Sequence, residues 1–561
     1  MKLYHRVACG LLLTIFSLSY VTGDEMTVYG RRGMVVTAHQ LASQVGMQVL
    51  MSGGNAIDAA VSIAAVLGVV EFEMSGPGGV GNMLVYWNQG PNPSVINLDF
   101  RDVIASKARM EMYDQKNKER GILASCVPGN IAGWHAALSR YGTISWEEAL
   151  KPAIEYAENG FPISGREVSY IEKNLETIQQ YPTSAAVYLP GGRPPKPGEI
   201  FVQKDLAQTL RRIAKHGPDI FYKGELADEF VSFSNEHGGV FTKADFENYQ
   251  VHWRQPVQTS YRNYQIVSAS APNFGPAIIE TFNILEGFDL PSMEPNSADF
   301  IHSIAESLKV AADDGMRYIG DPRFVEMPLE RLTSKNYAKN VRSRIHPQRA
   351  SYHVGEPLIG EPLIDDSNNT TAISVVDSKG NMVSAIQTLI SAMGSRVVFG
   401  NTGVLFNNNM RKVRSSGPNK LEPGKTFGTP SAPSMILHKN KPFMAIGGVG
   451  AANIWQAIAV VMAKVIDGEM DLHEAIASPR FTIRYGYMAV KKGLARDDQF
   501  QYRELTVEPG LSEKIRTELE ARGHELVEGY TGNVHAILID PKTGVMKGVG
   551  DPRIHARALA W

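Results

Sequence analysis

The chain has 561 residues, of which 43% are hydrophobic and 20% are charged, a composition typical of ordinary globular proteins. A chain of this length accommodates roughly two or three ordinary domains, or one large one. The formal net charge of −2 excludes the strongly basic surface of a nucleic-acid-binding protein, so nucleic acid is not an expected partner.

Residues 1–23 have the pattern of a secretory signal peptide. Lys2 and Arg6 precede an apolar run over residues 7–20, and small residues follow at 21–23. An uncleaved signal anchor is the alternative. Because the apolar run is shorter than the roughly 20 residues that a membrane span requires, we expect cleavage, secretion and no stable membrane span.

The sequence contains two cysteines, Cys9 and Cys126. Cys9 lies in the signal segment and is lost with it. A single remaining thiol cannot form an intrachain disulfide. Cys126 stands in the turn-like sequence SCVPGN, which favours a structural residue over a nucleophile.

The first elements after the signal segment are two helices. Residues 39–51 have helical periodicity and are followed by Gly53 and Gly54, which suit a helix end. Asn55 is a typical cap for a second helix with a stripe of small residues, which favours close packing on a sheet. The glycine-rich loop at 75–81 lacks the Lys-Ser/Thr end of a phosphate loop, so we exclude nucleotide binding.

The remaining pattern is mixed. Residues 84–87 and 95–100 favour strands, residues 134–160 predict helix, and the Pro/Gly-rich residues 189–198 predict a surface loop. Residues 201–345 are expected to be mostly helical. Beyond residue 370 we expect mainly strands, at 370–376, 382–388, 481–490 and 536–539. One helix is expected among them, at 454–466.

The stretch SNNTTAISVVDSKGNMVSAIQT, residues 367–388, predicts two strands joined by a turn at 378–381. Thr370 follows a polar run that we expect to be an exposed loop, and it opens the first strand. Cutting the chain before Thr370 would leave a free α-amine beside the Thr hydroxyl, so one residue would supply both nucleophile and base. The alternative is that paired threonines reflect β-propensity alone.

The segment TTAISVVDSKGNMVSAIQT resembles the autoprocessing site of the γ-glutamyltransferase family. The resemblance extends over nearly the whole chain after the signal segment. It is carried by GMVVTAHQLASQVGMQVLMSGGNAIDAAVSIAAVLGVVE, YGTISWEEALKPAIEYAENGFPIS, GPDIFYKGELADEF, GFDL and the glycine turn at 447–450. It implies an α/β fold, the four-layer αββα sandwich of the N-terminal-nucleophile hydrolases. It also implies no cofactor and no metal.

The resemblance further implies that Thr370 cuts the bond after Asn369. The products would be a large subunit, residues 24–369, and a small subunit, residues 370–561, which pair as a heterodimer and form one catalytic unit. The new α-amine, with an ordinary pKa of about 7.7–8.0, can accept the hydroxyl proton near neutral pH. Thr388 matches a second threonine that hydrogen-bonds the nucleophile.

Five further residues stand at the family's oxyanion and donor-binding positions, and two of them, Asn409 and Thr429, differ from the family's usual Gln or Glu and Ser. Gly450 and Ala451 occupy the two glycine positions of the turn whose backbone amides stabilise the oxyanion. Arg101 matches the arginine that binds the donor carboxylate, for which a guanidinium fork is suited; a surface salt bridge is the alternative. Asn409 and Thr429 occupy other donor-binding positions.

Other positions depart from the family pattern, namely Ala372 for a His, Ile390 for an Asn, Lys412 for an Asp and Pro430 for a Ser. An Asp-to-Lys change turns attraction for a substrate ammonium into repulsion. These departures argue against ordinary glutathione cleavage.

Three hypotheses about function follow from the residues and the resemblance. The first is a secreted γ-glutamyltransferase-like amide hydrolase or acyltransferase, with a small γ-glutamyl compound such as glutathione as the default donor. The second is an acylase-like hydrolase of another carboxylate-bearing amide. The third is a secreted effector or toxin with weak catalysis. The sequence does not choose the donor.

Overall fold

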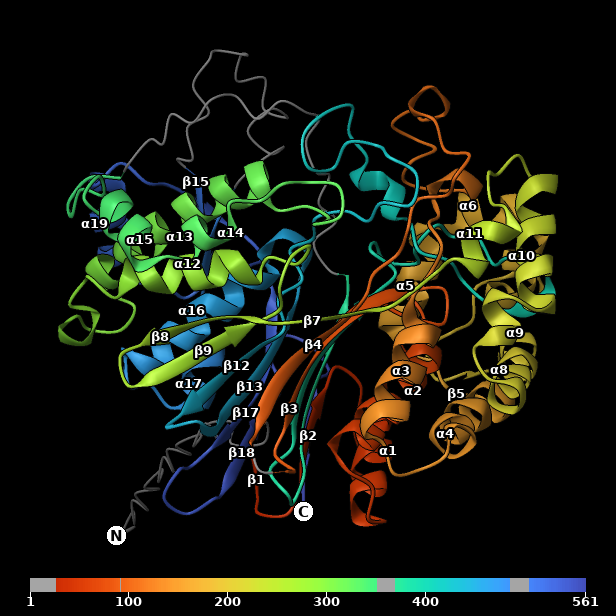
Figure 1. The fold of residues 1–561 in the computed structure, drawn as a ribbon, viewed down its shortest axis with the longest axis horizontal. Helices are drawn as coiled ribbons and strands as arrows, with labels where there is room; N and C mark the ends of the chain where they lie inside the picture. Colours follow the sequence, from red (N-terminus) through yellow and green to blue (C-terminus); the bar gives the residue numbers. More distant parts are fainter. Residues whose placement is uncertain (1–26, 91, 351–368, 485–503) are drawn as a thin grey trace, which may run out of the picture.

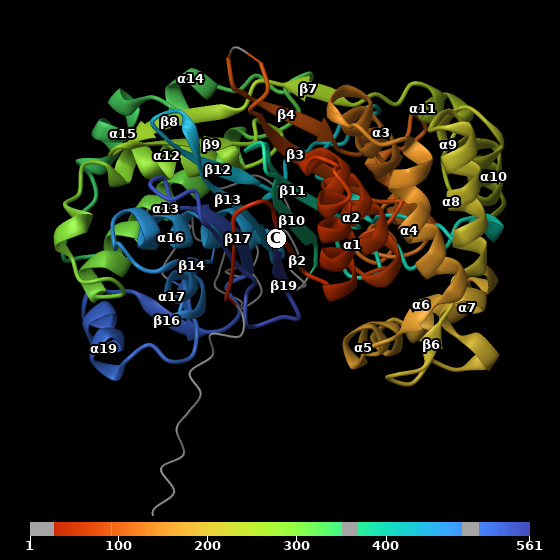
Figure 2. The same ribbon diagram turned by 90° about the horizontal axis from the view of Figure 1, so that it is seen from below.

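The computed structural model describes residues 27–90, 92–350, 369–484 and 504–561. Two sheets lie face to face at the centre, and helices cover the outer face of each (Figures 1 and 2). The predicted four-layer αββα sandwich is therefore confirmed. The predicted signal segment, residues 1–23, lies outside the described residues.

The first sheet has seven strands, and every neighbouring pair is antiparallel. Its order is β19 (Arg557–Ala560), β2 (Met34–Thr37), β10 (Thr371–Val376), β11 (Met382–Thr388), β3 (Val80–Trp87), β4 (Ser94–Phe100) and β7 (His252–Arg254).

The second sheet also has seven antiparallel strands. Its order is β1 (Thr27–Gly30), β18 (Met546–Val549), β17 (Asn533–Ile539), β13 (Lys441–Val449), β12 (Ser434–His438), β9 (Tyr264–Ser268) and β8 (Val257–Tyr261). The two sheets approach closely, since a Cβ built on Gly447 would lie 3.1 Å from the Cβ of Ala372.

Helices from the first half of the chain cover the first sheet. They are α1 (Gln40–Met51), α2 (Ala56–Val70), α3 (Asn130–Tyr141), α4 (Trp146–Asn159), α5 (Gly165–Lys173), α6 (Leu175–Gln180), α7 (Pro182–Tyr188), α8 (Lys204–His216), α9 (Asp219–Tyr222), α10 (Glu225–Glu236) and α11 (Lys243–Glu247). Every residue of α2 is buried, because it contacts α1, α4 and β10. Its small residues permit this close packing, as the sequence predicted. Strands β5 (Phe161–Pro162) and β6 (Ile200–Phe201) form a separate two-stranded sheet in this half of the molecule.

The second sheet is covered by helices from the middle and the end of the chain. They are α12 (Gly275–Leu285), α13 (Ala298–Tyr318), α14 (Leu329–Leu332), α15 (Lys335–Arg342), α16 (Ile454–Ile466), α17 (Leu472–Ala477) and α19 (Glu513–Ala521). A small sheet of β14 (Phe481–Ile483), β15 (Glu504–Val507) and β16 (Glu525–Glu528) adjoins them. Within the described ranges no helix is both long and apolar enough to cross a membrane.

The predicted cap at Asn55 is confirmed, but the prediction of one helix over residues 134–160 is wrong. The side chain of Asn55 accepts from the amides of Ile57 and Asp58 and caps α2. In place of one helix the structure has α3 and α4, separated at 142–145. The break occurs because Asp58 accepts hydrogen bonds from the amide and hydroxyl of Thr143, and Ser145 then caps α4.

The prediction of a mostly helical region over 201–345 is confirmed, but the sequence did not predict β7, β8 and β9, which lie within residues 252–268. β8 alternates buried and exposed residues over only five positions, so its strand signal is weaker than the helical periodicity of the neighbouring segments. The predicted strand at 481–490 ends at Ile483 as β14, and residues 485–490 lie outside the described residues.

Strand β10 is buried on both faces. All six of its residues are buried, because one face meets helix α2 and the other meets β13. Thr370 precedes the strand instead of opening it, and Asn369 is only 2% exposed. The prediction of an exposed polar loop is therefore wrong for Asn369; residues 367 and 368 lie outside the described part.

Both sheets combine strands from the two sides of residue 369. In the first sheet, β2 lies between β19 and β10, which both come from after residue 369. The last residue of the chain also forms hydrogen bonds with the turn between β1 and β2. The carbonyl oxygen of Trp561 accepts hydrogen bonds from the amides of Arg31, Arg32 and Gly33 at 3.1, 2.7 and 3.3 Å.

Candidate active site at Thr370

Thr370 has a backbone φ of +92°. A β-branched residue rarely adopts positive φ, because its side chain crowds the adjacent carbonyl groups, and such a residue stores strain of about 1–3 kcal/mol. Cutting the bond after Asn369 would remove the preceding carbonyl and with it the source of this strain. The backbone conformation therefore favours cleavage at this bond.

The hydroxyl of Thr370 lies between two acceptors. Its Oγ1 is 3.1 Å from Oγ1 of Thr388 and 3.2 Å from Oδ1 of Asn369. Oγ1 of Thr388 also accepts the backbone amide of Ile390 at 2.8 Å, which fixes its position. The hairpin register brings the two threonines together, since Thr371 pairs with Gln387.

The predicted glycine turn faces the same peptide bond. The amide of Gly450 donates a hydrogen bond of 3.3 Å to the carbonyl oxygen of Asn369. That oxygen would carry negative charge during attack on the carbonyl carbon, so this amide is positioned to stabilise it. Gly450 has φ +122°, and a Cβ there would lie 2.7 Å from Cα of Gly532. Ala451 has φ +52° and lines the adjoining cavity.

A cavity of about 60 Å³ adjoins Thr370. Most of its surface is apolar, and cationic side chains lie on one wall. It is lined by Asn369, Thr370, Ile386, Thr388, Ile390, Arg411, Lys412, Thr429, Pro430, Ser431, Ala451, Ala452 and Ile454.

Lys412 ends the short 3₁₀ helix η6 (Asn409–Lys412) and supplies a buried amine to this cavity. Its Nζ donates to Oγ1 of Thr429 at 3.2 Å. Burial lowers the pKa of Lys412 well below its ordinary value, the cationic Arg101 lowers it further, and Asp102 raises it. An anion beside Lys412 would therefore raise this pKa again.

Arg101 directly follows β4 and is 4% exposed, which rules out the alternative of a surface salt bridge. It is not among the residues that line the cavity, but it lies close to Lys412, whose pKa it lowers. Its Nη2 is 3.8 Å from Oδ1 of Asp102. Among the described residues, Nε and Nη2 have no hydrogen-bond partner, an uncommon state for a buried guanidinium.

Three other residues that the sequence analysis considered, Asn409, Ala372 and Cys126, do not line the cavity. Asn409 is fully buried, and its Nδ2 donates to Oδ1 of Asp102 at 2.5 Å, so it orients that carboxylate instead of facing the cavity. Ala372 packs between the sheets. Cys126 is buried, and burial together with Asp102 raises the pKa of its thiol, as expected for a structural cysteine.

Sequence reasoning missed two polar residues of the cavity, Arg411 and Ser431. Nη1 of Arg411 donates to Oγ of Ser391 at 2.6 Å, whereas its Nη2 has no partner within the described ranges. The hydroxyl of Ser431 likewise has no partner there. Arg411 precedes Lys412 and Ser431 follows Pro430, and the sequence analysis had indicated both of these neighbours. Position in the sequence was therefore the signal that could have identified Arg411 and Ser431.

The loop after β11 is held by the turn after α2. The amides of Leu389 and Met393 donate to the carbonyls of Met74 and Glu73 at 2.8 and 2.7 Å. The Glu73 carboxylate is buried 3.6 Å from Arg166, and burial raises its pKa although Arg166 lowers it. These contacts keep the loop that follows Thr388 in one conformation.

Comparison with known proteins shows which family this chain resembles. The family model described as gamma-glutamyltranspeptidase matches residues 42–561. An acylase ACY 1 proenzyme of Pseudomonas sp. (strain SE83) is 35% identical over 538 residues, covering 93% of this chain and 92% of the relative. A glutathione hydrolase proenzyme of Escherichia coli (strain K12) is 32% identical over 548 residues, covering 94% and 91%.

A crystal structure of cephalosporin acylase from Bacillus halodurans has the same fold. The TM-score is 0.86 at 29% identity, and the match covers 98% of this chain and 99% of that one.

We predict that Thr388→Val slows cleavage of the bond after Asn369 by about tenfold or more, because a buried hydroxyl partner of Thr370 is lost. Thr388→Ser keeps the hydroxyl and should stay close to the unmutated rate. Mass spectrometry of the protein at timed intervals after synthesis measures the cleaved fraction. Equal rates for the Val variant and the unmutated chain would rule out this contact as a contributor.

Proposed function

The chain belongs to the gamma-glutamyltranspeptidase family, and we propose that it acts as an acylase on amides whose acyl group ends in a carboxylate and lacks an α-ammonium. Family membership makes it an enzyme of the group that contains glutathione hydrolases and acylases. The proposal adds the donor and the route by which the nucleophile is released.

We propose that the chain matures by self-cleavage. Oγ1 of Thr370 attacks the carbonyl carbon of Asn369, the C–N bond breaks, and the nitrogen of Thr370 takes up a proton. The resulting ester is hydrolysed by water, which restores the hydroxyl and leaves a carboxylate on Asn369. The amide of Gly450, 3.3 Å from the Asn369 carbonyl oxygen, supports this step because it can stabilise the oxyanion.

Turnover would use the same hydroxyl. The free α-amine of Thr370 accepts the hydroxyl proton as Oγ1 attacks the donor amide, and the proton passes to the leaving amine. An acyl ester remains on Thr370. Water then releases the acid, or an acceptor amine takes the acyl group.

The preference for the donor rests on one observation: the amine of Lys412 lies in the cavity, 3.2 Å from Oγ1 of Thr429. With Arg411 on the wall and Arg101 behind it, the cavity holds an excess of positive charge. A donor carboxylate can pair with these groups and restore the proton of Lys412. A donor ammonium would be repelled, and the poorly screened interior strengthens that repulsion.

The name of the Bacillus halodurans protein, cephalosporin acylase, supports this choice of reaction. The Escherichia coli relative is named a glutathione hydrolase, which keeps γ-glutamyl amides as the donors to compare. Glutaryl and γ-glutamyl amides differ only in the α-amine, so this pair isolates the effect of Lys412.

Secretion through removal of residues 1–23 is part of the proposal. The charged start and the apolar run of this segment support it. The large chain of the secreted protein would then begin at Asp24.

We predict that the mature protein consists of two chains, the smaller of which begins Thr-Thr-Ala-Ile-Ser. Thr370→Ala should abolish both cleavage and turnover, because the nucleophilic oxygen is gone, and Thr370→Ser should retain part of each. N-terminal sequencing and assay of the purified protein test this. Full activity in an intact single chain would exclude the mechanism.

We predict that Arg101→Ala lowers kcat/KM for a glutaryl anilide about ten- to hundredfold, the effect of losing a charge-assisted contact of about 1.5–3 kcal/mol. Activity on a valeryl anilide, which lacks the carboxylate, should change far less. Arg254→Ala, which removes another partly buried arginine, is the matched control for stability. An equal loss on both donors would show that Arg101 acts only on the fold.

We predict that the unmutated enzyme prefers glutaryl over γ-glutamyl anilide, and that Lys412→Asp reverses the preference. The carboxylate pairs with protonated Lys412, whose pKa is lowered by burial. KM for the glutaryl donor should therefore be low below that pKa and rise as the pH passes through it. Lys412→Met should abolish this pH dependence of KM. Ordinary glutathione turnover by the unmutated enzyme would contradict the proposed role of Lys412.

A further inference from the structure

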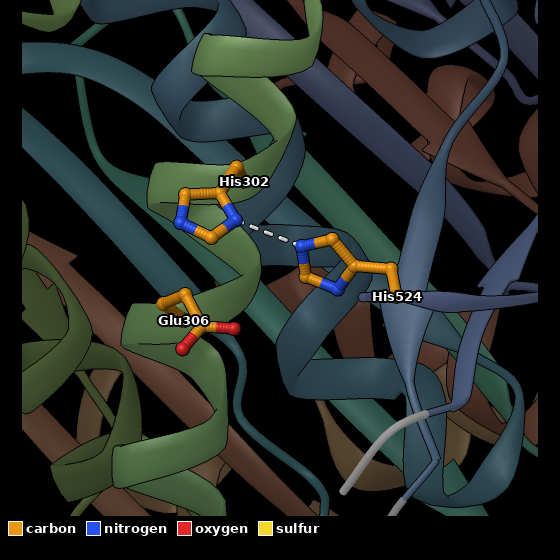
Figure 3. A group of neighbouring side chains, drawn as sticks. All are labelled: His302, Glu306 and His524. Atoms are coloured by element: carbon orange, nitrogen blue, oxygen red, sulfur yellow. Dashed lines mark hydrogen bonds between the residues drawn. The ribbon is translucent and has the colours of Figure 1, made fainter. Parts of the chain in front are cut away.

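A second group of ligand-type side chains lies outside the cavity at Thr370. His302 and Glu306 stand one turn apart on α13, so both point from the same face of the helix (Figure 3). His524 reaches them from the segment between α19 and β16. The three side chains are 1%, 1% and 3% exposed, and one ligand atom from each lies within 4.8 Å of the others.

The contacts of His302 fix which of its nitrogens carries the proton. Nε2 lies 2.8 Å from the carbonyl oxygen of His346, which can only accept, so Nε2 is the donor. Nδ1 therefore presents its lone pair, and it faces Nε2 of His524 at 2.8 Å. An imidazole whose second nitrogen donates to a backbone carbonyl is the usual arrangement of a metal-binding histidine.

His524 is suited to the same role. Because Nδ1 of His302 accepts, Nε2 of His524 carries the proton, and Nδ1 of His524 has no hydrogen-bond partner among the described residues. Transfer of that proton to Nδ1 frees Nε2 as a ligand. Burial lowers the pKa of His524 to about 2, and Lys309, His302 and Arg522 act in the same direction, so the ring is neutral.

Glu306 provides the negative charge of the cluster. Its Oε1 accepts a hydrogen bond of 2.6 Å from Nζ of Lys309, which is itself buried. Burial lowers the pKa of Lys309, although Glu306 raises it. A cation bound to the Glu306 carboxylate would take the place of the Lys309 ammonium as its partner in this buried site.

We propose that His302 Nδ1, His524 Nε2 and the Glu306 carboxylate bind one divalent transition metal ion, with Zn²⁺ as the best match. Two neutral imidazoles and one carboxylate form a ligand set typical of Zn²⁺, with a fourth position left for water. Tetrahedral bonds of about 2.0–2.1 Å separate ligand atoms by about 3.3 Å. The two histidine nitrogens would therefore move apart by about 0.5 Å, which the χ angles can supply.

The ion would join distant parts of the chain. His302 and Glu306 precede residue 369, whereas His524 follows it, so the ion would link the two chains that cleavage produces. This linking role rests on the proposed function, but metal binding does not.

The test uses the full chain, stripped with a chelator and titrated with Co²⁺, whose visible absorption reports tetrahedral nitrogen and oxygen ligands. We expect one Co²⁺ per chain, displaced by Zn²⁺. Glu306→Gln and His524→Asn should each weaken Co²⁺ binding by about a hundredfold, because each removes one of three ligands. His216→Asn, which changes an exposed histidine on α8, is the matched control and should bind normally.

A thermal readout guards against variants that fold poorly. Zn²⁺ should raise the Tm of the unmutated protein and leave that of Glu306→Gln, which has the same shape, unchanged. Thr370→Ala should bind Co²⁺ normally, so failure of cleavage and failure of metal binding are separate results. Absence of stoichiometric uptake, or equal uptake by His524→Asn, would overturn the proposal and leave a hydrogen-bonded histidine pair.

Discussion

The hydrogen-bonded ladder that holds β10 between β2 and β11 is the constraint on which the candidate active site depends. All six residues of β10 are buried, and its partners fix the register on both edges. A slip by one residue would exchange the side chains on its two faces, both of which are packed. The ladder can therefore hold Thr370 at φ +92° just before the strand, because the strain there is small beside the cost of losing the register.

The chemistry beside Thr370 is set by the sign of a few charges in a poorly hydrated space. Lys412 and Arg411 line the cavity, Arg101 lies behind them, and Asp102 is the nearby carboxylate to which Asn409 is bonded. Under the proposed function, an acidic or a basic residue at position 412 would decide whether an ammonium or a carboxylate is favoured there, since charge interactions are strong where water is scarce. One fold can thus host both glutathione hydrolases and acylases without changes to its sheets.

Local signals in the sequence carried much of the fold and part of the site. The cap at Asn55, the helix at α16 and the hairpin of β10 and β11 each depend on neighbouring residues, and the equal arms of that hairpin place Thr388 beside Thr370. Features that depend on tertiary contacts were not predictable. The break between α3 and α4 requires Asp58, far away in sequence. The position of Asn409 behind the cavity depends in the same way on Asp102.

Each sheet combines strands from the two sides of residue 369, and this has a consequence for how a cleaved protein would behave on dilution. Neither segment contains a complete sheet, so separation of the two chains would expose strand edges and the apolar surfaces between the sheets at once. Dissociation and unfolding would then be the same event. A cleaved molecule would stay paired with its own partner and would not exchange chains with other molecules. Because melting would release two unfolded chains, the cleaved protein would melt in one transition, and its midpoint would rise with protein concentration where the chains can pair again.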